Sequence, residues 1–243
     1  LYKESTDSHT VYHFAPAGEE TGSPHTPFDH EASYSLPRPY FRTEVRTSLH
    51  GLRYAIDTVW GLKDFDTPGF EAQLFSQWAV KSPTSERLLV WNPGQGHIPA
   101  IALSAWGETL SSIDLAGRDT LALAASAHNL LFRTGGGVFA AADFREAAEM
   151  VMQGENPRYG TVVIDLEHIP SVLREDYLRG AAPELLADGG ILVIIGKSSD
   201  LHPYSKGWQD FSLTYSQKHK GNRLLGLRYE PNGRKPNGGP PVD

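Results

Sequence analysis

Between residues 87 and 195 the sequence alternates short apolar strands with helix-length segments, and this alternation constrains the fold more than any other feature. Segments that alternate in this way form a parallel sheet covered by helices on both faces. The sequence therefore predicts an α/β fold. The predicted strands are Arg87–Trp91, Thr109–Asp114, one near Leu130–Thr134, Thr161–Ile164 and Ile191–Ile195. The predicted helices are Ile98–Trp106, Gly117–Asn129, Phe144–Met152 and Val172–Leu186, with a turn at Asp188–Gly190.

The segments on either side of this region break the alternation. Upstream, period-two patterning around the turn His50-Gly51 predicts a β-hairpin, and the apolar spacing of Phe70–Val80 predicts a helix. Downstream, Phe211–Tyr215 and Leu224–Tyr229 predict an antiparallel pair joined by the polar loop Ser216–Arg223.

We therefore expect four parts. They are a polar N-terminal arm over 1–35 with a short strand at Thr10–Phe14, a β-hairpin and helix extension over 36–84, the α/β domain over 85–230 and a flexible tail over 231–243.

Composition limits the chemistry and the partners. The chain has 243 residues, a formal net charge of −7 and no cysteine, which excludes disulfides, thiolate metal sites and a cysteine nucleophile. The sequence has neither a membrane-length apolar run nor a signal-peptide pattern, so we expect a cytoplasmic location and no membrane partner. His25, Asp29 and His30 could be invoked as metal ligands, but solvated side chains are the favoured interpretation and we expect no metal.

Because the net charge is negative, contact with RNA would need a local basic patch. The candidates lie in the predicted late loop and near it, and a solvated hairpin tip is the favoured interpretation over contact with phosphates. They are Lys218, His219, Lys220, Arg223, Arg228, Arg234 and Lys235.

A glycine turn follows the first predicted strand of the α/β domain. Gly94 and Gly96 in Asn92-Pro-Gly-Gln-Gly96 would let the backbone approach a ligand closely. About 20 residues on, Asp114 ends the second predicted strand, where a carboxylate can accept both hydroxyls of a ribose. Ile98 and Pro99 stand where a dinucleotide fingerprint has its third glycine, so a nucleoside cofactor without phosphates is favoured over NAD. A purely structural turn is the alternative.

From about Tyr40 to Glu230 the chain resembles the class I S-adenosylmethionine (SAM)-dependent methyltransferases, and within them the small-domain family that includes ribosomal RNA guanine-N2 methyltransferases. Asn92–Gly96 lies at the family's Asp-x-Gly-x-Gly, Ser112–Asp114 at its ribose-binding acid, and Ala142–Phe144 at its adenine-binding position. The resemblance implies a Rossmann-like sheet of order 3-2-1-4-5-7-6 with the last strand antiparallel, and SAM as cofactor. The implied cofactor-binding residues are Asn92, Gly94, Gln95, Gly96, Asp114, Asp143 and Phe144.

The chain departs from that pattern in three places. Asn92 replaces the usual acid, Ile98 replaces a glycine, and Asp165–His168 stands where amino-methylating members have Asn-Pro-Pro-Phe. By resemblance Asp165 would accept a hydrogen bond from the target amine, and His168 would stack on the base or act as a base near neutral pH. Glu167 adds a further acceptor. Alternatively, these three residues only order the loop or are solvated.

Three functions remain open from the sequence. The first is a SAM-dependent methyltransferase acting on RNA, with a ribosomal RNA base as the acceptor that the resemblance implies. The second is a methyltransferase-like binding or scaffold module without catalysis. The third is an NAD-dependent oxidoreductase, which the missing third glycine and the antiparallel end of the sheet disfavour. The sequence predicts no oligomeric state.

Overall fold

The computed structural model describes residues 2–5, 10–13, 38–130, 136–141, 143–152, 158–167, 169–208 and 210–231. The chain divides into two compact units, Leu1–Ser33 and Tyr34–Asp243. In the first unit, β1 (Tyr2–Ser5) pairs antiparallel with β2 (Thr10–His13), which confirms the strand predicted at Thr10. Most of the predicted arm and tail lies outside the described residues, so those two boundaries stay predictions.

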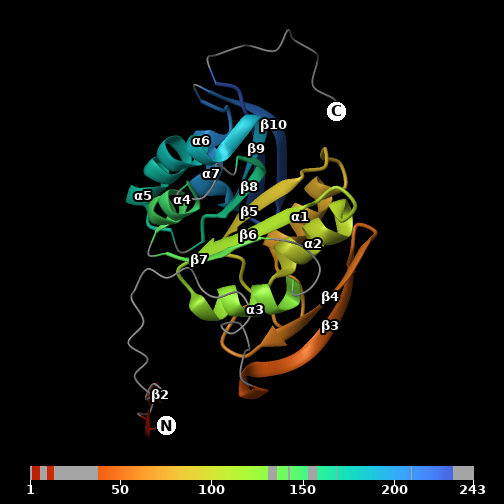
Figure 1. The fold of residues 1–243 in the computed structure, drawn as a ribbon, viewed down its shortest axis with the longest axis vertical. Helices are drawn as coiled ribbons and strands as arrows, with labels where there is room; N and C mark the ends of the chain where they lie inside the picture. The colour runs from red at the N-terminus through yellow and green to blue at the C-terminus, as the bar shows by residue number, and fades with distance from the viewer. Residues whose placement is uncertain are drawn as a thin grey trace. The chain divides into compact units, whose positions relative to one another are not determined.

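The second unit is built on a seven-stranded sheet of order β10-β11-β9-β8-β5-β6-β7 (Figure 1). The five strands β5 to β9 run parallel, and β11 is antiparallel to both of its neighbours. This order confirms the predicted 3-2-1-4-5-7-6 sheet. The strands are β5 (Arg87–Trp91), β6 (Ser112–Gly117), β7 (Val138–Ala140), β8 (Tyr159–Asp165), β9 (Leu186–Lys197), β10 (Phe211–His219) and β11 (Asn222–Tyr229).

Helices cover both faces of this sheet, because strands such as β5 are apolar on both sides and bury nearly all of their surface. Figure 1 shows α1, α2 and α3 on one face and α4, α5 and α6 on the other. The helices are α1 (Phe70–Ala79), α2 (His97–Trp106), α3 (Thr120–Leu130), α4 (Phe144–Met152), α5 (Ser171–Glu175), α6 (Ala182–Leu185) and α7 (Ser198–Leu201). A π-helical turn, Asp176–Ala181, joins α5 to α6, so the predicted helix Val172–Leu186 is present in three pieces.

The predicted hairpin extension packs on the same domain. β3 (Phe41–Leu49) pairs with β4 (Leu52–Val59) through a two-residue turn in which His50 and Gly51 have φ of 50° and 86°. Positive φ at both positions is the type I′ geometry that matches strand twist. β4 then packs against α2 and α3. Among the described residues, no helix is long and apolar enough to cross a membrane.

Three predicted boundaries in the sheet are wrong. β10 and β11 extend to a two-residue turn at Lys220-Gly221, so the eight-residue loop predicted over Ser216–Arg223 is mostly strand. The predicted turn Asp188–Gly190 lies inside β9, where the pairing with β8 shifts register. The third strand is Val138–Ala140 and not Leu130–Thr134, because α3 continues through Leu130.

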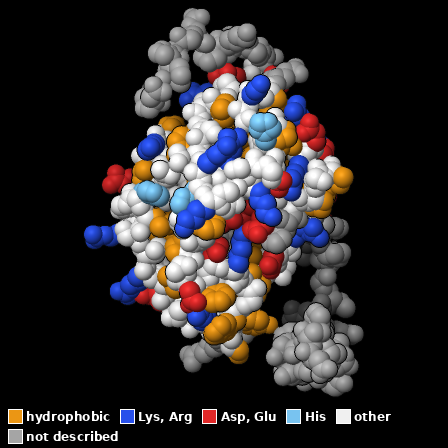
Figure 2. Space-filling view, turned by 180° about the vertical axis from the view of Figure 1, so that it is seen from behind, with side chains coloured by type: hydrophobic (Ala, Val, Ile, Leu, Met, Phe, Trp, Pro, Cys, Tyr) orange, Lys and Arg blue, Asp and Glu red, His pale blue; other side chains and the backbone are white. Residues whose placement is uncertain are grey.

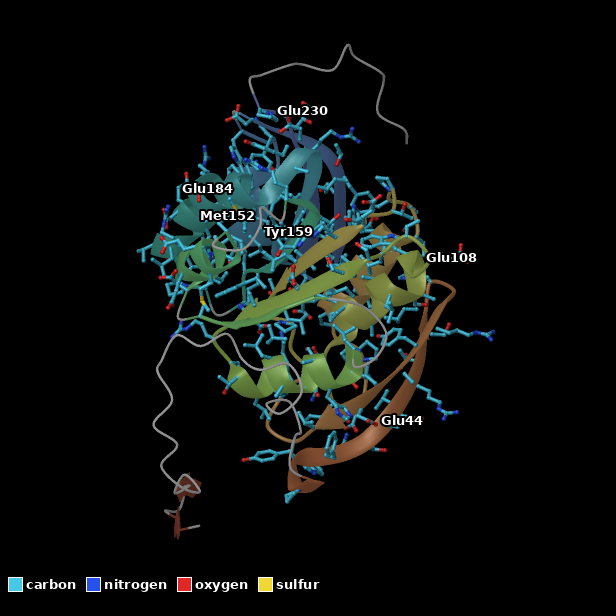
Figure 3. The ribbon with its side chains drawn as sticks, viewed as in Figure 1. Glu44, Glu108, Met152, Tyr159, Glu184 and Glu230 are labelled. Atoms are coloured by element: carbon cyan, nitrogen blue, oxygen red, sulfur yellow. The ribbon has the colours of Figure 1, made fainter. Side chains whose placement is uncertain are left out.

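The fourth error concerns β6, which was predicted to end at Asp114 and instead ends at Gly117. Asp114 pairs with Leu89 in the middle of the sheet, and Leu115 and Ala116 extend the strand beyond it. The strand was predicted to end at Asp114 because a polar residue more often marks the end of a buried strand than its interior. Tyr159, which lies in the interior of the domain (Figure 3), supplies the partner that lets a carboxylate sit there.

Candidate functional site

A cavity of about 440 Å³ opens at the carboxyl ends of β5, β6 and β8. The chain passes from β5 to β6 on one side and later crosses to β8 on the other, so the cavity lies where the strand order reverses. Open α/β sheets bind ligands at this position. The residues that follow the three strands and line the cavity are Trp91–Gly94, Gly117–Asp119, Asp165, Glu167, Ile169 and Pro170.

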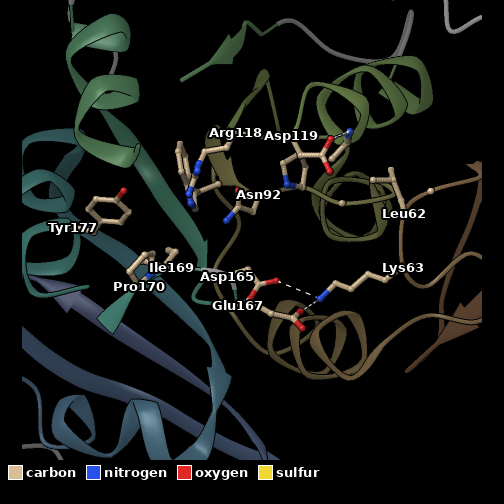
Figure 4. A pocket seen from close by; sticks show the side chains of 16 residues that line it. Leu62, Lys63, Asn92, Arg118, Asp119, Asp165, Glu167, Ile169, Pro170 and Tyr177 are labelled. Atoms are coloured by element: carbon tan, nitrogen blue, oxygen red, sulfur yellow. Dashed lines mark hydrogen bonds and ion pairs between the residues drawn. The ribbon is translucent and has the colours of Figure 1, made fainter. Parts of the chain in front are cut away.

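The walls of this cavity differ in character. Figure 4 shows Ile169, Pro170 and Tyr177 on one side and Leu62 and Lys63 on the other, with Asn92 and Arg118 between them. The first side is largely apolar. The remaining lining carries charges of both signs, from Lys63, Arg118, Asp119, Asp165 and Glu167.

The turn after β5 approaches the cavity with its backbone. Asn92 and Gly94 both have φ of 58°, in the left-handed region that Gly and Asn adopt more readily than other residues. This explains why Asn fits at the first position of the turn. A Cβ on Gly94 would have no neighbour within 4 Å, so the turn leaves open space beside it. Both predicted residues line the cavity.

Gln95 and Gly96 serve packing and do not line this cavity. Gln95 is buried, and its side chain accepts from the Val59 N–H at 3.0 Å and donates to the Val59 carbonyl at 2.9 Å, which fixes the end of β4. Gly96 has φ of 93° at the start of α2, and a Cβ there would lie 3.2 Å from the Ser126 Cα. Its glycine is required by the backbone and by the close approach of α3.

Asp114 also lies away from the cavity. Its Oδ2 accepts from the Tyr159 hydroxyl at 2.6 Å, its Oδ1 accepts from the Gly137 N–H, and Arg87 Nη2 is 3.7 Å away. Burial and the neighbouring carboxylate raise the pKa of Tyr159, so this hydroxyl remains a donor. The carboxylate that follows β6 at the cavity is Asp119, which the sequence analysis missed.

Asp119 could have been identified from the sequence, because it also caps a helix. Its Oδ1 accepts from the backbone N–H groups of Leu121 and Ala122 at 2.9 and 3.1 Å, as an N-cap of α3. An Asp-Thr pair before an apolar helix is a sequence signature of such a cap. A prediction that the helix begins after Asp119 would have placed the end of the preceding strand near Gly117. It would also have placed Asp119 at the carboxyl edge of the sheet.

Asp143 and Phe144 are likewise structural in this geometry. Asp143 Oδ1 accepts from the Glu146 N–H at 2.9 Å, which caps α4. Phe144 is fully buried and packs edge-on against Trp91, with ring centroids 5.4 Å apart. Neither residue lines the cavity. Ala142 lies outside the described residues.

Asp165 ends β8 and faces the cavity while only 7% exposed. Its Oδ1 accepts from the Glu167 N–H at 2.8 Å, and Lys63 Nζ is 3.8 Å from its Oδ2. Lys63 also pairs with Glu167 (Figure 4). It lies 3.7 Å from Glu71 as well. The lysine thus balances an acidic corner formed by Glu71, Asp165 and Glu167. His168, the other predicted catalytic residue, lies outside the described residues.

The buried His97 beside this turn is held neutral. Its Nε2 lies 3.0 Å from the Asp64 carbonyl, which can only accept, so this nitrogen carries the proton. Nδ1 then accepts from the Tyr54 hydroxyl at 3.0 Å. Burial lowers the pKa of His97 and raises the pKa of Asp64. Both ring nitrogens are therefore occupied by the fold.

Four exposed or half-buried cations lie at the tip of the β10–β11 hairpin and beside it, three on the hairpin and one, Lys197, at the end of the neighbouring β9. β10 runs parallel to β9, so its end lies at the same sheet edge as the cavity. Lys220 Nζ lies over the Phe70 ring at 5.5 Å, and the neighbouring Glu71 belongs to the acidic corner. Within the described part of the chain none of these cations pairs with a carboxylate. They are Lys197, Lys218, Lys220 and Arg223.

Lys218 and Arg223 stand directly opposite each other across the two strands. Like charges in this arrangement are destabilising unless an anion balances them. Arg228, a further candidate for phosphate contact, pairs with Ser212 and Ile191 at the other end of the strand, so it does not belong to this patch. Arg234 and Lys235 lie outside the described residues. Figure 2 shows Lys, Arg and His side chains on one face of the molecule, with Asp and Glu side chains among them.

No family model matches this sequence, and no curated protein matches it either. Solved structures do. The chain is similar to a protein from Streptococcus mutans assigned as a SAM-dependent methyltransferase, with 10% identity over 77% of this chain and 56% of that chain and a TM-score of 0.58. It is also similar to YhhF from Escherichia coli, assigned as a methyltransferase, with 14% identity over 77% and 99% of the two chains and a TM-score of 0.54.

A third similar structure is the 16S rRNA N2 G1207 methyltransferase RsmC of T. thermophilus, in complex with AdoMet and guanosine. Identity is 18% over 86% of this chain and 49% of that chain, with a TM-score of 0.50. This chain thus spans about half the length of the S. mutans and T. thermophilus proteins. The resemblance drawn from the sequence is confirmed at the level of the fold, which is that of the SAM-dependent methyltransferases.

Proposed function

We propose that this chain binds SAM in the cavity at the ends of β5, β6 and β8 and transfers its methyl group to a base of RNA. The observation that carries the proposal is the position of this cavity, at the point of the sheet where the strand order reverses, in a methyltransferase fold. Its volume of about 440 Å³ lies within the range of ~300–1,000 Å³ typical of small-molecule sites.

The lining residues fit this cofactor. The apolar side formed by Ile169, Pro170 and Tyr177 suits an adenine ring, and the buried Trp91 Nε1 has no hydrogen-bond partner among the described residues. The cavity's carboxylates suit a sulfonium, an ammonium group and ribose hydroxyls. The first turn of α2 does not line the cavity, so the helix that follows the glycine turn does not offer its N-terminus to a pyrophosphate there. This geometry supports SAM over NAD.

For the ribose we assign Asp119 in place of Asp114. Asp119 follows β6 at the cavity, and its Oδ1 is held by two backbone N–H groups of α3. A carboxylate fixed in this way loses little conformational freedom when it binds a ligand. The other carboxylate oxygen can then accept hydrogen bonds from hydroxyl groups. Asn92 and Gly94 would approach the cofactor from the turn after β5.

Bound SAM supplies an electrophilic methyl group. Such a transfer depends mainly on holding the acceptor atom in line at about 3–3.5 Å, so the protein's task is positioning. We assign Asp165 to accept a hydrogen bond from an exocyclic amine of the acceptor base, with Lys63 and the Glu167 N–H holding its carboxylate. His168 stays a predicted second residue of this loop.

The basic hairpin tip supports RNA as the acceptor. Four cations without carboxylate partners among the described residues lie at the sheet edge of the cavity, in a protein whose net charge is −7. A local patch of this kind suits phosphates, because each neutralised phosphate releases counterions. RNA would thus be held by its backbone at the tip while a base enters the acidic corner.

A second candidate function, a SAM-binding module without catalysis, is favoured by two observations. The Asp165 carboxylate is already engaged by Lys63 and by the Glu167 N–H, and β6 ends in Gly117, which has no side chain to offer a ligand. In this case cofactor binding would persist and methyl transfer would be absent.

Calorimetry of the purified chain with SAM, S-adenosylhomocysteine and NAD tests the proposal. We expect micromolar binding of the first two and none of NAD, with a matching rise in Tm. Asp119→Asn keeps the helix cap but weakens SAM binding by about tenfold, which is about 1.4 kcal/mol. Asp114→Asn is the matched control and leaves binding unchanged. Absence of binding at millimolar SAM would overturn the proposal.

Transfer of a radiolabelled methyl group to RNA separates the two functions. Incorporation into ribosomal RNA or its fragments supports the enzyme. Micromolar SAM binding without incorporation into any RNA supports the binding module.

A further inference from the structure

Trp60 is a large aromatic side chain left in solvent. It is 51% exposed, although it directly follows β4 and precedes Gly61–Lys63, which line the cavity. Its backbone is fixed, because its N–H donates to the Tyr40 carbonyl at 2.9 Å. A tryptophan buries a large area when it finds a partner, so leaving half of it in water forgoes a substantial stabilisation.

The ring is braced from within the chain. The Arg42 guanidinium lies 4.8 Å from the Trp60 ring centre and 4.3 Å from that of Phe65, and the two rings are 6.0 Å apart. Arg42 is in turn fixed by an ion pair with Asp66 and by donation to the Phe65 carbonyl at 3.4 Å. An arginine stacked in this way restricts the ring's rotamers. Trp60 is therefore held in place with part of its surface free.

A second exposed apolar side chain also flanks the cavity. Among the described large hydrophobic residues that are exposed, Val172 at 82% and Trp60 at 51% are the two most exposed. Val172 lies two residues after Pro170, which lines the cavity. Scattered exposed apolar residues need no explanation, but two that flank one cavity indicate a surface that binds something.

We propose that Trp60, braced by Arg42 and Phe65, is a stacking platform for an unpaired base of single-stranded RNA, next to the base that enters the cavity. The inference rests on the proposed RNA acceptor. Unpaired RNA bases are recognised by stacking on aromatic rings and arginine planes, and both are present here. The basic tip supplies cations for the phosphates of such an RNA.

Fluorescence anisotropy with a labelled single-stranded RNA of about 12 nucleotides tests the platform, on the full chain and without SAM. Trp60→Leu keeps an apolar side chain but removes the stacking surface, and we expect it to weaken binding by about tenfold. Trp60→Phe should keep binding within about threefold of the unchanged protein. Leu213→Ala, another exposed apolar position on β10, is the matched control and should have no effect.

The salt dependence of binding separates stacking from phosphate contact. Trp60→Leu should shift the affinity at every salt concentration and leave the slope of log K against log salt unchanged. Lys218→Gln with Lys220→Gln should lower that slope, by about 0.7 for each phosphate that the protein no longer neutralises. Duplex RNA should bind in a way that does not depend on Trp60.

Three results would overturn the inference. They are no RNA binding by the unchanged protein, equal affinity of Trp60→Leu, or an equal dependence of duplex binding on Trp60. Because the assay contains no SAM, its outcome is independent of cofactor binding. RNA binding that depends on Trp60 in a chain that fails to bind SAM would support the platform and reject the proposed enzyme.

Discussion

Two aspartates of the sheet, Asp114 on β6 and Asp165 on β8, have almost the same burial and opposite surroundings. They are 6% and 7% exposed, and each has a cation within 4 Å, Arg87 at 3.7 Å and Lys63 at 3.8 Å. Asp114 lies in the middle of its strand, and its carboxylate accepts a hydrogen bond from the buried Tyr159 hydroxyl. Asp165 is the last residue of its strand and lines the cavity.

The difference teaches that burial and a charged neighbour do not identify a functional carboxylate in this fold. The position along the strand does. A mid-strand carboxylate has its partners fixed by the sheet, whereas one at a carboxyl end faces the loops where ligands bind. We therefore expect Asp114 to affect stability and Asp165 to affect activity.

The largest expected effect is on methyl transfer by Asp165→Ala. Loss of the hydrogen-bond acceptor for the substrate amine should lower kcat by about 100-fold, or about 2.7 kcal/mol. Transfer of a labelled methyl group to RNA under saturating SAM measures it. Asp114→Asn is the matched control and should retain kcat. Equal losses in the two variants would contradict the distinction between the two aspartates.

The second effect is on stability at Asp114. Asp114→Ala leaves the Tyr159 hydroxyl and the Gly137 N–H buried without their acceptor, so we expect a loss of about 2 kcal/mol in the free energy of unfolding. Tyr159→Phe should cost about 1 kcal/mol. Urea unfolding of both single variants and the double variant measures the coupling, and strictly additive losses would show that the two residues do not act as a pair.

Much of this fold could be predicted because it rests on local apolar patterning. The strand Arg87–Trp91 and the helix Phe144–Met152 were predicted to the residue, and the order of the sheet followed from the family resemblance. The errors fall where a polar residue is buried or where a turn is tighter than its polarity implies. Asp114 is the first case and the Lys220-Gly221 turn is the second.

The site was harder to predict because it depends on which residue of a strand is last. An error of three residues at the end of β6 exchanged Asp119 for Asp114. Asn92, Gly94 and Asp165 do line the cavity, because each ends or follows a strand whose end was located within one residue. Lys63 comes from a segment distant in sequence, and no local pattern indicates its approach to Asp165.

The two glycines of the turn after β5 offer a similar comparison between a residue at the cavity and one buried in the fold, with a smaller expected effect. Both Gly94→Ala and Gly96→Ala place a side chain at positive φ, which costs about 1 kcal/mol. Gly96→Ala also meets Ser126, so we expect it to be the less stable of the two in thermal unfolding. Gly94→Ala projects into open space and should weaken SAM binding more. The reverse pattern would place Gly96, and not Gly94, at the ligand.

The smallest expected effect is a pH dependence of the folding stability that comes from His97. This residue lies beside the turn, but its side chain is buried and hydrogen-bonded within the fold, as that of Asp114 is. Burial lowers the pKa of His97 in the folded chain, so as pH falls through about 6.5 the unfolded chain takes up the proton first. Stability from this group is present above about pH 6.5 and is lost as pH falls towards the folded pKa, by at most about 1.4 kcal/mol per pH unit.

His97→Gln can keep both hydrogen bonds without titrating. Urea unfolding between pH 8 and 5 should show a steeper decline for the unchanged protein. Parallel curves would mean that burial does not lower the pKa of His97. SAM affinity should stay constant in the variant, because His97 does not line the cavity.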